Sequence, residues 1–242
     1  MAHTLFISDL HLCAERPHIN RQFFDFVALT AVGADALYIL GDLFEYWVGD
    51  DDADDDLNAR VAASLKALAK RSVAVFLMQG NRDVLLGAAY AERCGAKLLN
   101  DPTLIDLHDT RTLLMHGDTL CTDDIEYQKF RAYAHDPQTQ RNFMAQPLAA
   151  RHQQIRAMRA QSETSKRLKH EAIMDVSLSA VESVLRKHGY PRLIHGHTHR
   201  PARHEHRVDS HRCERWVLGD WYERGSYLRC SAGGCEAVQL PA

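Results

Sequence analysis

Five short segments rich in Asp and His contain the residues whose types and spacing suit metal-assisted chemistry. They read Asp9-x-His11, Gly41-Asp42, Gly80-Asn81-Arg82-Asp83, His116-Gly117-Asp118 and Gly196-His197-Thr198-His199. Their side chains offer carboxylate, amide and imidazole ligands and no thiolate. This set of oxygen and nitrogen ligands suits Mn²⁺, Fe²⁺ or Zn²⁺, and it differs from a structural zinc site built on cysteine.

Phosphate ester or anhydride hydrolysis is the chemistry that such a set would assist. The substrate is an anion that repels hydroxide, and two cations roughly 3.5–4 Å apart neutralise the phosphate oxygens and lower the pKa of a bound water. One carboxylate must then touch both ions. Asp42 is the candidate for this bridge, because Gly41 before it permits a close approach of the backbone.

Each segment follows a short apolar run that predicts a buried strand. The runs are Leu5 to Ile7, Ala36 to Leu40, Val73 to Met78, Thr112 to Met115 and Leu193 to Ile194. Helices are predicted over 20–29 and 57–70, between the first strands. Polar residues at the ends of successive strands are how an α/β fold builds a site, so we expect the five segments to meet at one edge of a sheet.

Composition sets the bounds on the kind of protein. The chain has 242 residues and a net charge of −3, so we expect one large domain, or a core with an insertion, and no nucleic-acid partner. The six cysteines form no Cys-x-x-Cys pair and no targeting segment precedes the first strand, which predicts reduced thiols and a cytoplasmic location. The acidic run at 50–56 is predicted to be a solvated loop or the first turn of a helix, and the alternative is a cation site.

Residues 123–188 differ from the rest of the chain because they show almost no strand pattern and contain no glycine before Gly189. Helices are predicted over 123–135, 138–143, 148–162 and 164–188, and a break within the last of them stays open. A strand then returns at 192–195, directly before the last Asp- and His-rich segment. A helical block inserted between two parts of a site is typical of a cap that selects the substrate.

In order and content, the five segments resemble the calcineurin-like metallophosphoesterase superfamily, from Ser8 to about Pro201. The resemblance implies an α/β fold with a central β-sandwich flanked by helices and with a helical cap insertion. Residues 1–122 and 189–242 would form the core, and 123–188 the cap. The family pattern places Asp9, His11, Asp42 and His199 on one metal ion and Asp42, Asn81, His116 and His197 on the other.

Longer local matches resemble a narrower family, the pyrophosphatases of lipid A biosynthesis. These matches are Arg82 in the third segment, His116 to Asp124, Met158 to Ser162, Ala172 to Val176, Ile194 to Pro201 and Val217 to Trp221. The resemblance implies hydrolysis of UDP-2,3-diacylglucosamine to UMP and 2,3-diacylglucosamine 1-phosphate, with two Mn²⁺ ions and attack of water at the phosphorus on the uridine side.

The same resemblance implies which residues contact the substrate. They are Asn81, Arg82, Asp124, Ser162, Lys166, Lys169 and His197. Arg82 would assist catalysis by stabilising charge on the phosphate; the alternative is a structural ion pair with Asp83 or Asp118. Asp83 and Asp118 would orient a ligand, or Asp83 would cap a helix. The role of Lys166 stays open, because the family often has a smaller polar residue there.

The two acyl chains of that substrate call for an apolar groove in the cap and for work at a membrane surface. We therefore expect peripheral association with the cytoplasmic face of the inner membrane. Two alternatives stay open: a metallophosphodiesterase that acts on a soluble nucleotide, and a non-enzymatic scaffold with a degenerate metal site. The intact ligand positions argue against the scaffold, whereas the ligand types do not choose among Mn²⁺, Fe²⁺ and Zn²⁺.

Overall fold

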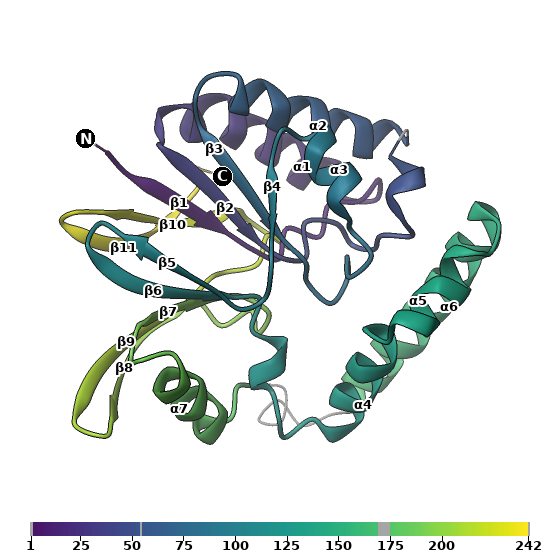
Figure 1. Ribbon diagram of the computed structural model, residues 1–242. Helices are drawn as coiled ribbons and strands as arrows, with labels where there is room; N and C mark the ends of the chain where they lie inside the picture. The colour runs from purple at the N-terminus through teal and green to yellow at the C-terminus, as the bar shows by residue number, and fades with distance from the viewer. Residues whose placement is uncertain (1, 54, 169–174, 242) are drawn as a thin grey trace.

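Two β-sheets packed face to face form the centre of the molecule, and helices cover their outer faces (Figure 1). The computed structural model describes residues 2–53, 55–168 and 175–241, with side chains described outside 160–168. The predicted β-sandwich flanked by helices is confirmed. Among the described residues, no helix has the length and apolar content needed to cross a membrane.

The first sheet has the strand order β11-β10-β1-β2-β3-β4. Its strands are β1 (Thr4–Ile7), β2 (Ala36–Leu40), β3 (Ala74–Met78), β4 (Lys97–Leu99), β10 (Ser226–Ser231) and β11 (Gly234–Gln239). Strands β1 to β4 run parallel to one another, and β10 pairs antiparallel with β1. The carboxyl ends of β1, β2 and β3 therefore lie at one edge of this sheet.

The second sheet has the strand order β5-β6-β7-β9-β8. Its strands are β5 (Thr103–Leu107), β6 (Thr110–Met115), β7 (Arg192–His195), β8 (Ala202–Val208) and β9 (His211–Val217). Strands β6 and β7 are parallel neighbours. The five polar segments thus follow strands of two sheets, and the expectation that a single sheet edge carries them is wrong.

Alternation of side chains across the strands explains how the layers pack. Phe6 of β1 faces the interior between the sheets with Leu114 and Ile194 of the second sheet. Its neighbours Leu5 and Ile7 face the other way, into the core under the helices. That core is covered by α1 (Pro17–Asp25), α2 (Asp56–Ala69) and α3 (Ala88–Arg93), while α7 (Leu178–Lys187) covers the second sheet.

The inserted helices extend away from the sandwich as a separate bundle (Figure 1). They are α4 (Ile125–Ala134), α5 (Pro137–Met144) and α6 (Leu148–Leu168). The predicted break near residue 163 is wrong, because 148–168 contain no Gly or Pro and form one continuous helix. The predicted helix over 164–188 is correspondingly too long, since residues 175–177 are not helical and α7 begins at Leu178.

The last two strands of the first sheet carry a disulfide bond between Cys230 and Cys235. The two residues lie directly opposite each other in the β10–β11 pair, with Cα atoms 4.1 Å apart. The prediction that every cysteine is reduced is wrong for this pair. Cys13, Cys94, Cys121 and Cys213 are buried.

Candidate metal centre

Sharp turns of the backbone present most of the predicted ligands. Five of them have positive φ angles, between 51° and 69°: Asp9, His11, Asp42, His197 and His199. This left-handed conformation costs energy for residues other than glycine, and it persists where surrounding structure fixes it, often at functional sites. The chain therefore turns immediately after β1, β2 and β7 and directs these side chains to one place.

Two glycines without positive φ allow these turns to touch. A Cβ atom on Gly80 would lie 2.2 Å from Asp42 Oδ1 and 2.4 Å from the Asp42 backbone nitrogen. A Cβ atom on Gly196 would lie 2.3 Å from Asp9 Oδ2. Both distances are far below van der Waals contact, so only glycine fits at these two positions.

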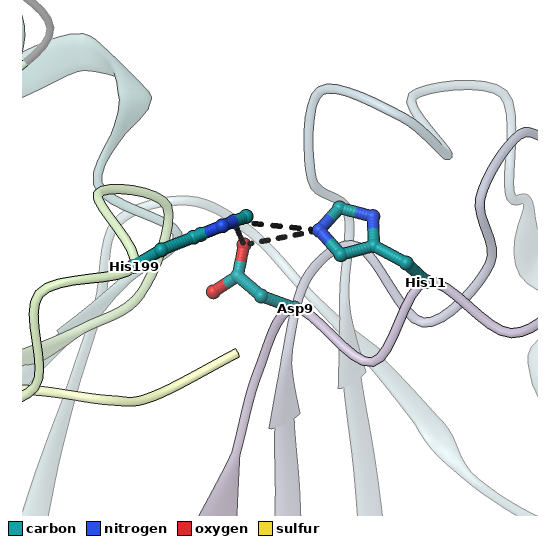
Figure 2. Close-up of side chains that lie close together, drawn as sticks. All are labelled: Asp9, His11 and His199. Carbon is teal, nitrogen blue, oxygen red and sulfur yellow. Dashed lines mark hydrogen bonds and ion pairs between the residues drawn. The ribbon is translucent and has the colours of Figure 1, made fainter. Parts of the chain in front are cut away.

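Asp9, His11 and His199 form the first group of ligand atoms (Figure 2). His199 Nε2 lies 3.3 Å from Asp9 Oδ1 and 3.4 Å from His11 Nε2. Asp9 is fully buried, and its Oδ1 atom has no hydrogen-bond partner. A buried carboxylate oxygen without a donor, facing two imidazole nitrogens, fits a bound cation.

Asn81, His116 and His197 form a second group. Asn81 Oδ1 lies 3.1 Å from His116 Nε2 and 2.9 Å from His197 Nδ1. Because the amide oxygen of Asn81 is neutral, unlike a carboxylate, it leaves net positive charge for a phosphate when cations are bound.

Asp42 lies between the two groups. Its Oδ2 atom is 3.8 Å from His11 Nε2, and its Oδ1 atom is 3.8 Å from His116 Nε2. One oxygen thus faces each group, which is the geometry of a bridging ligand. Asp9, Asp42 and His116 also bring ligand atoms within 4.8 Å of one another, so the two ligand groups are directly adjacent.

Backbone hydrogen bonds hold this arrangement in place. Asp83 is fully buried, and its carboxylate accepts N–H groups of Asp42 and Gly80 at 3.2 and 2.7 Å. It also accepts from Leu43 at 2.7 Å. His116 Nδ1 lies 3.0 Å from the carbonyl oxygen of Leu40, which directs Nε2 to the ligand group. Asp83 therefore fixes the bridging loop rather than an imidazole.

Asp118 and Asp220 have roles that the sequence did not predict. The Asp118 carboxylate accepts hydrogen bonds from Tyr127 Oη at 2.8 Å and Arg131 Nε at 2.6 Å, so it anchors α4 and orients no ligand. Asp220 Oδ2 instead lies 3.3 Å from His199 Nδ1. A carboxylate behind a metal-binding imidazole is the usual support, and Gly219-Asp220 after β9 was the signal that could have suggested it.

Burial and mutual charge shift the pKa values of the candidate ligands. Burial raises the pKa of Asp42 to about 7, and the nearby Asp83 and Asp9 carboxylates add to the rise. Burial lowers the pKa of His116, but the carboxylates of Asp42, Asp9 and Asp118 outweigh it and raise the value to about 9. Burial raises the pKa of Asp9, but His199, His116 and His11 lower it overall. Without cations, protons on His116 and partly on Asp42 balance the buried charge.

Loading the metal-free protein with Mn²⁺ should release protons. At pH 7 His116 holds a proton and Asp42 holds one in about half of the molecules, given pKa values of about 9 and about 7, and both must lose them to act as ligands. Affinity for Mn²⁺ should therefore rise from pH 6 to pH 9, and the number of protons released should fall over that range. Calorimetric titration in buffers of different ionisation enthalpy measures this number. Equal proton release at pH 6 and pH 9 would contradict the assignment.

Glu45 is the centre of an ion-pair network beside the first group, and sequence reasoning missed it. It is buried, and its carboxylate accepts hydrogen bonds from Arg16 and from Arg159 of α6. Arg82 Nη1 lies 3.9 Å away and His11 Nδ1 lies 3.8 Å away. No close contact joins Arg82 to Asp83 or Asp118 in the described residues, so the structural alternative for Arg82 loses support.

The structure describes the other expected substrate contacts to different extents. Asp124 is buried at the N-terminus of α4, where its Oδ1 atom accepts the Tyr127 N–H at 3.0 Å. Ser162 and Lys166 lie on α6, within the part whose side chains are not described. Lys169 lies outside the described residues. Of the expected substrate contacts whose side chains the structure describes, Asn81, Arg82 and His197 lie at the ligand cluster.

Part of the acidic run makes specific contacts, while Asp51, Asp55 and Asp56 are exposed as predicted. Asp50 accepts hydrogen bonds from the N–H groups of Gly87 and Tyr90 at 2.8 and 3.0 Å. Asp51 pairs with the buried Arg151 of α6, which also donates to the carbonyl of Val48 at 2.5 Å. The contacts of Arg151 attach the inserted helices to the core. The alternative of a helix N-terminal turn is confirmed at Asp55, which caps α2.

Comparison with known proteins agrees with this geometry. The calcineurin-like phosphoesterase family matches residues 2–201. A protein of Aromatoleum aromaticum named UDP-2,3-diacylglucosamine hydrolase is 55% identical over 95% of this chain and 94% of its own. A protein of the same name from Xanthomonas axonopodis pv. citri is 52% identical over 98% of each chain. This chain belongs to the calcineurin-like phosphoesterase family.

Proposed function

We propose that this chain hydrolyses the pyrophosphate bond of UDP-2,3-diacylglucosamine, giving UMP and 2,3-diacylglucosamine 1-phosphate, a step of lipid A biosynthesis. The observation that carries the proposal is a complete ligand cluster in a chain 55% identical, over 95% of its length, to a protein named for hydrolysis of that substrate. Full coverage matters here, because the match includes the inserted helices as well as the shared family core.

Divalent metal ions belong to the activity of the family, and the residues present fit them. We infer two Mn²⁺ ions per chain. Asp9, His11, Asp42 and His199 would hold one, and Asp42, Asn81, His116 and His197 the other. The support is the pair of ligand groups joined by Asp42 and the unpartnered Asp9 Oδ1. When bound, such ions neutralise phosphate oxygens and lower the pKa of a water.

The chain's own residues would bind and orient the pyrophosphate. Arg82 is 11% exposed, and Glu45 Oε1 lies 3.9 Å from its Nη1 atom, so its position is restrained while it can still contact a ligand. Its guanidinium would pair with the phosphate and stabilise the charge that develops there. Asn81 and His197 lie together and would contact the same group. Water attacks the phosphorus on the uridine side, so its oxygen ends in UMP and the bridging oxygen leaves with the lipid phosphate.

The inserted helices would select the lipid half of the substrate. Residues 123–188 would form this cap, and 1–122 and 189–242 the catalytic core. Helix α4 exposes three large apolar side chains, Ile125, Phe130 and Tyr133. Side chains of this kind suit acyl chains or a lipid surface better than they suit water. Asp124 precedes this helix, and Ser162, Lys166 and Lys169 would bind polar groups of the sugar.

A lipid substrate implies work at a lipid surface. We infer that the protein is cytoplasmic and associates peripherally with the inner membrane, with no nucleic acid among its partners. The exposed apolar residues of α4 and the exposed Arg156 of α6 support the inference, and Lys166 and Arg167 follow on the same helix. Co-sedimentation with vesicles containing anionic lipid, compared with neutral vesicles, tests it.

Comparison of two substrates tests the proposed function. UDP-2,3-diacylglucosamine in detergent should be hydrolysed with a kcat/KM at least about 100-fold above that for UDP-N-acetylglucosamine, because only the first can bury acyl chains in the cap. Equal values would support the alternative, a metallophosphodiesterase acting on a soluble nucleotide. Omission of Mn²⁺ is the control, and it should remove both activities.

A further inference from the structure

A cavity of about 360 Å³ adjoins the first ligand group on the side of His11. Its lining residues come from the loop after β1, the loop after β2, helix α6 and the C-terminal segment: Cys13, Glu15, Arg16, Glu45, Arg159 and Tyr222. The Tyr222 ring stacks on His11 with centroids 4.9 Å apart and planes 6° apart. The cavity is therefore adjacent to the candidate metal centre, and the contact between Tyr222 and His11 joins the two.

The charges of this lining are balanced and fixed in place. The lining contains two arginines, which are positively charged donors, and two glutamates, which are negatively charged acceptors. The positive and negative charges are therefore equal in number. Arg16 and Arg159 both bond to Glu45, and Arg16 also donates to the carbonyl of His11 at 2.6 Å. An acyl chain would exclude water from these charged groups and offer them no hydrogen bond in return, which is costly. A polar group with its own donors and acceptors, such as a nucleoside, would satisfy them.

The position of the cavity points to one half of the substrate. Asn81 and His197 belong to the second ligand group, and Tyr127 of α4 lies against His197 with ring centroids 5.5 Å apart. Helix α4 carries the exposed apolar residues that suit the lipid half. A pyrophosphate that crosses the centre then places its other end beside His11, where the cavity begins.

We propose that this cavity is the subsite for the nucleotide half of the substrate, the uridine and ribose of UMP. The proposal rests on the proposed function and adds residues that bind the other product. Arg16 and Arg159 donate to the uracil carbonyl oxygens, and the exposed Glu15 carboxylate accepts from the ribose hydroxyls. A volume of 360 Å³ is at the lower end for ligand pockets, which fits a nucleoside without its lipid.

Calorimetric titration of the Mn²⁺-loaded protein with UMP, and separately with inorganic phosphate, tests the subsite. Both probes offer a phosphate to the metal centre, but only UMP reaches the cavity. UMP should bind at least about tenfold more tightly than phosphate, as loss of one charge-assisted hydrogen bond is worth about that factor. Glu15→Gln and Arg159→Gln should each weaken UMP binding by about tenfold and leave phosphate binding unchanged.

Arg203→Gln is the matched control, because Arg203 lies on the edge strand β8, pairs with Glu214 of β9, and belongs neither to the ligand groups nor to the lining of the cavity. It should change neither affinity. Equal affinities for UMP and phosphate in the unmodified protein would overturn the proposal, as would equal weakening of both probes by Arg159→Gln. Hydrolysis of the lipid nucleotide without selective UMP binding would contradict the proposed subsite and leave the proposed function supported. Selective UMP binding without hydrolysis of the lipid nucleotide would contradict the proposed function and support the subsite.

Discussion

Replacing His116 by alanine should lower kcat by on the order of 1,000-fold or more, equivalent to about 4 kcal/mol of transition-state stabilisation. The imidazole Nε2 atom lies 3.1 Å from Asn81 Oδ1 and 3.8 Å from Asp42 Oδ1, so its loss opens the second ligand group. Asn81→Ala should have an effect of the same order, because it removes the oxygen between His116 and His197. Initial rates at saturating Mn²⁺ and lipid nucleotide measure both.

Folding must be separated from catalysis in this experiment. His18→Ala is the matched control, because His18 is exposed on α1 and lies outside the ligand groups. All three variants should keep the circular dichroism spectrum of the unmodified protein, and His18→Ala should keep its rate. A His116→Ala protein that is folded and retains more than about a tenth of the rate would contradict the assignment of the second ligand group.

Gly80→Ala should abolish Mn²⁺ binding at the bridging position and destabilise the protein. The added Cβ atom would lie 2.2 Å from Asp42 Oδ1 and 2.4 Å from the Asp42 nitrogen, so the bridging carboxylate or the backbone of its loop must move. Overpacking of this kind costs about 1–3 kcal/mol of folding free energy. Thermal unfolding measures the stability, and metal content after dialysis measures the binding.

Gly33→Ala adds the same methyl group at a position where nothing lies within 4 Å of the new Cβ atom. It should change the free energy of unfolding by less than about 0.5 kcal/mol and leave the metal content unchanged. Gly80→Ala would argue against the bridging role of Asp42 if it bound two Mn²⁺ ions per chain and unfolded at the same temperature as Gly33→Ala.

The strands that carry the ligands could be predicted because each combines a short apolar run with a polar end. β2 begins and ends at the predicted residues, Ala36 and Leu40. The assignment of these strands to two sheets could not be predicted, because an apolar run does not say which neighbour it pairs with. The helices predicted over 123–135 and 138–143 match α4 and α5 closely, whereas the helix end predicted at 162 was misplaced, because 148–168 contain no Gly or Pro to end a helix.

The ligands were predicted from residue type, whereas their supports were not. Asp220 and Glu45 lie far along the chain from the residues they contact: Asp220 supports His199, and Glu45 joins Arg16 to Arg159. Such contacts depend on tertiary structure: Gly219-Asp220 after a strand could mark Asp220 as a site residue, but nothing in the sequence names His199 as its partner. The acidic run illustrates the same point, because Asp50 and Asp51 looked solvated until α3 and α6 were in place.

The most direct test of the account is hydrolysis of UDP-2,3-diacylglucosamine in ¹⁸O-labelled water, with the products analysed by mass spectrometry. The protein is first stripped of metal and then supplied with Mn²⁺. We expect one labelled oxygen in UMP, an unlabelled 2,3-diacylglucosamine 1-phosphate, and no turnover without the metal. Label in the lipid phosphate would contradict attack at the uridine-side phosphorus. No turnover of this lipid, together with rapid cleavage of an aryl phosphodiester, would contradict the proposed substrate itself.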